Sequence, residues 1–125
     1  MKRLLIAAGL LAVSASCVLA GPWEDGMAAY NRGDYVPTLQ LVRPLAQQGN
    51  ARAQALIGVM YRKGQGVAKS SKHAFMWLSL ASAKGDTKAK SELRDMSQSM
   101  TPEELAQARE MMQACEASNY RSCEY

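Results

Sequence analysis

The feature that most constrains this fold is an internal repeat in the middle of the chain. Residues 44–50 (PLAQQGN) resemble residues 80–86 (LASAKGD) at an offset of 36. The same offset places Ala53 on Ala89. A repeat of about this length favours helix pairs that stack on one another, because a single pair cannot bury its own apolar stripe.

Apolar residues recur at helical spacing, and no segment shows a sustained alternation of polar and apolar residues. Ala74, Trp77, Leu78 and Ala81 follow the i, i+3, i+4, i+7 pattern of one helix face. We therefore expect an all-α fold, in which short joints make successive helices antiparallel. The predicted helices cover residues 22–32, 35–48, 51–63, 71–84, 87–98 and 102–118.

Capping signals mark the predicted helix ends. Thr101 to Glu104 reads as a capping box with proline at the first helical position. The pairs Gly49-Asn50 and Gly85-Asp86 each predict a helix stop followed by a helix start.

The first twenty residues predict a secretory signal peptide. A basic start at Lys2 and Arg3 precedes an apolar run and then small residues up to Ala20. Cleavage after Ala20 leaves one domain, residues 21–125, in the periplasm or outside the cell. A less favoured alternative is a lipoprotein acylated at Cys17, because Ser14 stands where such a signal usually carries leucine.

Charge and hydropathy exclude two classes of partner. Removal of the signal peptide lowers the formal net charge from +4 to +2, and a nucleic-acid binder needs a concentrated basic face. We therefore expect no nucleic-acid partner. We also expect no membrane insertion after the signal is removed, because no later segment is long and apolar enough to span a bilayer.

Two cysteines remain in the processed chain, Cys115 and Cys123. An even pair in an exported protein predicts a disulfide. A continuous helix would hold their Cα atoms roughly 12 Å apart, beyond the reach of a disulfide. The chain must therefore turn back between them, around residues 118–119.

Residues 51–89 resemble a repeat of the Sel-1-like repeat (SLR) family, which is related to tetratricopeptide repeats. The segment 26–50 resembles a degenerate earlier copy. The positions that carry the resemblance are small, glycine or aromatic residues, namely Ala53, Gly58, Met60, Tyr61, Gly64, Gly66, Val67, Ala74, Trp77, Ala81, Gly85 and Ala89.

The resemblance implies a right-handed superhelix of antiparallel helix pairs. Repeats cover about 26–50 and 51–86, a further helix covers 87–98, and residues 101–125 form a capping helix with a disulfide tail. We expect Gly58 to allow close helix approach, Gly64 and Gly66 to take positive φ, and Trp77 to wedge between helices.

The resemblance also implies a function. SLR proteins are mainly adaptors, so we expect a non-catalytic module of the bacterial cell envelope that binds another protein. Alternatives are an immunity-type protein that blocks a secreted toxin, and a small envelope-directed hydrolase or cell-wall ligand binder. The expected contact surface is the concave side built by the first helix of each pair, with exposed contacts at Arg52, Ala55, Val59, Arg62, Lys88, Ser91 and Asp95.

The sequence offers no catalytic pattern. His73 is the single histidine, and no serine or cysteine nucleophile stands at a recognised spacing from it. We therefore expect no enzyme, no cofactor and no metal, with His73 partly exposed at the start of its helix.

Overall fold

The computed structural model describes residues 20–123. The expected signal peptide, except for Ala20 itself, and the alternative lipidation site at Cys17 lie outside these residues. Within them the chain is all-helical, which confirms the predicted all-α class. Each helix bound agrees with the predicted one to within one residue: α1 is Pro22–Asn31, α2 Tyr35–Gln47, α3 Ala51–Lys63, α4 Ser71–Ala83, α5 Thr87–Ser97 and α6 Pro102–Ala117. The described helices are each too short or too polar to cross a bilayer.

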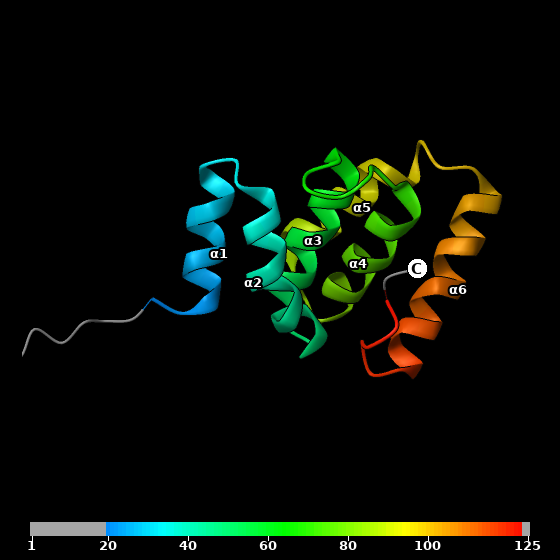
Figure 1. Cartoon of the computed structure of the whole chain (residues 1–125). Coiled ribbons are helices and arrows are strands. Elements are labelled where there is room, and N and C mark those ends of the chain that lie inside the picture. Colours follow the sequence, from blue (N-terminus) through cyan, green and yellow to red (C-terminus); the bar gives the residue numbers. More distant parts are fainter. Residues whose placement is uncertain (1–19, 124–125) are drawn as a thin grey trace, which may run out of the picture.

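The helices follow one another in space much as they do in sequence. Figure 1 shows α1 and α6 at opposite ends of the molecule, with α3 and α4 between them and α5 behind. α1 packs on α2 and α3 packs on α4, while α2 meets α3 and α4 meets α5. Alternate helices also touch, α3 with α5 and α4 with α6. α3 and α4 therefore form the centre of the fold.

The core is centred on α3 and α4. Every residue of α3 from Ala53 to Tyr61 is buried, because neighbouring helices cover the helix on several sides. Trp77 of α4 has no exposed surface. A Cβ added to Gly58 would lie 2.6 Å from Cγ of Leu78, so the glycine allows α3 and α4 to come this close.

The two helix joints related by the 36-residue offset have the same local structure. Gly49 and Gly85 take φ values of 86° and 94°. The next amide in each joint, that of Asn50 or Asp86, donates to a carbonyl five residues earlier at 3.1 Å. The side chains of Asn50 and Asp86 then accept from the amides of Ala53 and Ala89 at 3.0 and 2.8 Å. Each joint thus combines a glycine helix stop with a side-chain helix cap.

The loop after α3 docks against the first helix pair. Gly64 and Gly66 take the expected positive φ values of 70° and 72°. Between them, Gln65 accepts a hydrogen bond from the Tyr30 hydroxyl at 2.9 Å and donates one to the Tyr35 hydroxyl at 3.2 Å. The loop therefore ties α3 to α1 and α2.

The C-terminal segment turns back as predicted. α6 begins with the expected capping box at Thr101 and ends at Ala117. Asn119 and Tyr120 then take positive φ, which brings the Cα atoms of Cys115 and Cys123 to 4.6 Å in a disulfide.

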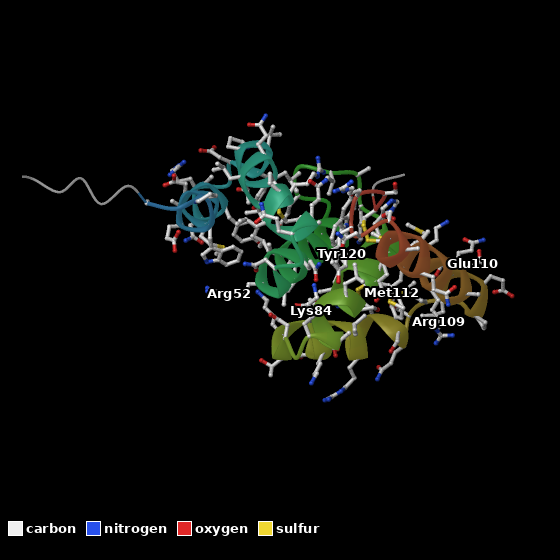
Figure 2. The ribbon with its side chains drawn as sticks, turned by 90° about the horizontal axis from the view of Figure 1, so that it is seen from below. Arg52, Lys84, Arg109, Glu110, Met112 and Tyr120 are labelled. Carbon is white, nitrogen blue, oxygen red and sulfur yellow. A yellow bond between two sulfur atoms is a disulfide. The ribbon has the colours of Figure 1, made fainter. Side chains whose placement is uncertain are left out.

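The turn places Tyr120 over Lys84, the exposed residue that ends α4. The ammonium of Lys84 lies 4.4 Å from the centre of the Tyr120 ring, and Figure 2 shows the two side chains together. The same ammonium donates to the Gly49 carbonyl at 2.6 Å. The tail is thereby linked to the joint between α2 and α3.

Candidate interaction groove

A groove of about 160 Å³ lies between α1, α3 and α5. Its walls combine apolar and charged side chains, namely Trp23, Met27, Arg52, Ala55, Leu56, Asp86 and Lys88. We call it the α1/α3/α5 groove. It shares no lining residue with a second groove between α4, α5 and α6.

Helical spacing places the side chains of the groove. Trp23 and Met27 are four residues apart, so they lie on one face of α1. Arg52 and Leu56 form the corresponding pair on α3, and Ala55 lies beside them. Asp86 is the N-cap of α5. The groove is therefore set by the faces of two helices and the start of a third.

The charged groups of the groove are two bases and one acid. The Arg52 guanidinium lies 4.6 Å from the centre of a Trp23 ring, a cation–π contact that joins α3 to α1. Figure 2 shows Arg52 on the same side of the molecule as α1, the blue helix. Asp86 already accepts the Ala89 amide, whereas Lys88 is exposed. The groove can thus offer positive charge beside an apolar surface.

The structure brings only part of the expected contact set together. Arg52, Ala55 and Lys88 line the groove. Arg62 instead forms an ion pair with Glu92 that links α3 to α5. Ser91 and Asp95 are exposed on α5 outside the groove.

The prediction that Ala55 and Val59 are exposed is wrong. Ala55 is 5% exposed and Val59 is 1% exposed. The expectation assumed that α3 keeps one face in solvent, but α2, α4 and α5 all pack on α3. Ala55 still borders the groove, whereas Val59 does not line it.

Four lining residues escaped the sequence analysis: Trp23, Met27, Leu56 and Asp86. The i, i+4 spacing of Trp23 and Met27 was a signal for one apolar face of the first helix. Leu56 directly follows Ala55, so an expected contact face turned slightly further about the α3 axis would have included Leu56. Asp86 was recognised only as a cap, and its place beside the groove follows from how α5 packs on α3.

The single histidine lies outside the groove. His73 is partly exposed, as expected, and its ring stacks on Tyr61 with centroids 4.9 Å apart. Its Nδ1 lies 2.8 Å from the Ser70 hydroxyl oxygen. Within residues 20–123, no three His, Cys, Asp or Glu side chains are grouped closely enough to hold a metal ion.

No protein-family model and no curated protein sequence matches this chain. The function is therefore inferred from the grooves and from the arrangement of the helices.

Proposed function

We propose that this chain is an exported helical-repeat module, similar to SLR proteins, that binds a segment of another protein in the α1/α3/α5 groove. In this proposal α1–α2 and α3–α4 are stacked helix pairs of a solenoid, α5 begins a third unit, and α6 with its disulfide tail is the cap. The observation that carries the proposal is the groove itself, which the first helix of each unit lines.

The matching joints support the repeat interpretation. Joints 36 residues apart share the positive-φ glycine, the five-residue hydrogen bond and the side-chain cap. Between the second and third units, the contacts of α3 with α5 and of α4 with α6 are those expected when successive pairs stack in one direction.

The lining of the groove supports a peptide of defined chemistry. Trp23, Met27 and Leu56 offer an apolar surface to one side chain of the partner. Arg52 and Lys88 offer cations to a neighbouring carboxylate. Charge at the border of an apolar site adds specificity and speeds association. A segment that carries an apolar residue beside an acidic one fits both features.

The disulfide supports an oxidising compartment. Cys115 and Cys123 are both buried, with exposures of 0% and 1%, and disulfides persist mainly in exported proteins. A partner in the periplasm or outside the cell is therefore proposed.

A site-specific crosslinking experiment tests this function. A photoreactive residue replaces Lys88, which lines the groove, or Lys90, which is exposed two residues away and lines neither groove. The full chain is irradiated in its own cells, and adducts are identified by mass spectrometry. We expect a specific protein adduct from position 88 and none from position 90. The same spectra report whether the chain begins at Gly21 or at an acylated Cys17.

A charge-reversal pair provides the control. Lys88→Glu and Lys90→Glu change the net charge equally, but only the first alters the groove. We expect Lys88→Glu alone to weaken capture of the partner. Equal adducts from both positions, or equal effects of both reversals, contradict the proposal.

A further inference from the structure

The second groove lies between α4, α5 and α6. It has a volume of about 420 Å³ and is lined by Phe75, Ser79, Ser82, Ala83, Leu93, Arg109, Met112, Gln113 and Glu116. We call it the α4/α5/α6 groove. It exists because α5 and α6 hardly contact each other, whereas α1–α2 and α3–α4 pack closely. One side of α4 is therefore left open between the two helices.

The shape of the α4/α5/α6 groove suits an α-helix. Its floor is a stripe on α4 in which Phe75, Ser79 and Ser82 follow helical spacing, with small residues beyond the phenylalanine. Small side chains allow a helix backbone to come close. Leu93 and Met112 form apolar walls on α5 and α6. Figure 2 shows Met112 on the side of α6 that faces α5, while Glu110 projects from the other side.

The two ends of the α6 wall carry opposite charges. Arg109 and Glu116 are seven residues apart, which is two turns or about 10 Å along the helix axis. Both line the groove and both are exposed, with Met112 and Gln113 between them. Along α6 an occupant therefore meets a positive charge at one end, the apolar Met112 and the uncharged Gln113 in the middle, and a negative charge at the other end.

We propose that the α4/α5/α6 groove binds an amphipathic helix of a separate protein, with an apolar stripe flanked by one acidic and one basic residue two turns apart. The acidic residue pairs with Arg109, the basic residue pairs with Glu116, and the stripe covers Met112 and Leu93. Helix-in-groove recognition uses this arrangement of apolar anchors. The proposal does not depend on the α1/α3/α5 groove, because the two grooves share no residue.

The test uses three peptides of about 18 residues, long enough to form a helix on binding. They share one apolar stripe and differ only at two flanking positions seven residues apart: Glu and Lys, Lys and Lys, or Glu and Glu. Binding to the full chain is measured by fluorescence anisotropy. We expect the Glu/Lys peptide to bind at least about fivefold more tightly than either like-charged peptide.

Charge reversal in the groove must change the order of the three peptide affinities. Arg109→Glu makes both ends acidic, so the Lys/Lys peptide becomes the tightest ligand. Glu110→Arg, on the far side of α6, keeps the original ranking. Ala83→Trp fills the groove and weakens all three peptides at least about tenfold, whereas Ala106→Trp, exposed on α6 outside the groove, does not. Circular dichroism verifies that each variant is folded.

Several results overturn the proposal. These are absence of peptide binding, an unchanged ranking in Arg109→Glu, or full binding to Ala83→Trp. Sedimentation of the chain alone tests a second copy as the occupant. A dimer that dissociates on the Ala83→Trp substitution assigns the groove to self-association and contradicts a separate partner.

Discussion

Gly58 of α3 faces Leu78 of α4 so closely that a Cβ on residue 58 would lie 2.6 Å from the Leu78 Cγ and 3.1 Å from the Leu78 amide nitrogen. The second of these atoms belongs to the backbone of α4 and cannot rotate away. The distance between α3 and α4 therefore depends on the absence of a side chain at residue 58.

Gly58→Ala is expected to lower the free energy of unfolding by about 1–3 kcal/mol. Overpacking against Leu78 outweighs the gain in helix propensity, which is about 1 kcal/mol. Urea unfolding followed by circular dichroism measures the difference. Combined with Leu78→Ala, the glycine substitution should cost less than it does alone, because the shorter side chain leaves room. Additive effects would contradict direct contact between residues 58 and 78.

Trp77→Ala is expected to lower the free energy of unfolding by about 3–5 kcal/mol, because it leaves a large cavity between the central helices. Trp77→Phe should cost clearly less. It keeps an aromatic ring, and the buried indole nitrogen has no hydrogen-bond partner among the described residues to lose. Thermal unfolding of both variants tests this order. Equal losses would show that volume at this position is not what stabilises the core.

The two matching joints predict matching effects of substitution. Asn50→Ala and Asp86→Ala each remove a side-chain cap and should each cost about 1 kcal/mol. Ser91→Ala, at an exposed residue that caps no helix, provides the control and should change the free energy of unfolding little. Chemical denaturation gives all three values. A large difference between the two cap variants would indicate that the joints are not energetically equivalent.

Reduction of the disulfide is expected to lower the free energy of unfolding by about 2–3 kcal/mol, the value of the chain-entropy model for so short a loop. Urea unfolding with and without dithiothreitol measures it. A double variant, Cys115→Ala with Cys123→Ala, is the control, since its stability should not respond to the reductant. If the reductant also lowers the free energy of unfolding of the double variant, the effect does not arise from this disulfide.

The ion pair between Arg62 and Glu92 is expected to contribute about 0.2–1 kcal/mol, because both side chains are partly exposed. Arg62→Glu and Glu92→Arg should each destabilise the fold, and the double exchange should restore most of the loss. The coupling should weaken as salt is added. A double-mutant cycle at low and high ionic strength measures both effects, and a coupling of zero would contradict a pair in solution.

Local signals in the sequence predicted the helices well. Each end is set by residues close to it, such as the Thr101 capping box and the glycines at 49 and 85, so short-range physics determines the bounds. The turn between Cys115 and Cys123 followed from the length of a helical segment compared with the reach of a disulfide.

The candidate grooves were predicted less well. The burial of Val59 depends on three helices that pack around α3, which no local pattern of α3 reveals. The contribution of Trp23 requires knowing that its ring on α1 meets Arg52 of α3. The α4/α5/α6 groove has no sequence signal at all, because it results from the separation of α5 and α6. The bounds of a helix depend on residues near its ends, whereas a groove depends on how helices that are distant in the sequence pack together.

The equivalent joints at Gly49 and Gly85 have an evolutionary consequence. The chain ends one helix and begins the next in the same way at both places. Duplication or loss of the 36 residues between them would add or remove one helix pair, α3 with α4, and leave each junction chemically unchanged. A single recombination event in the gene can therefore change the length of the protein by one helix pair, because no new type of helix joint is needed.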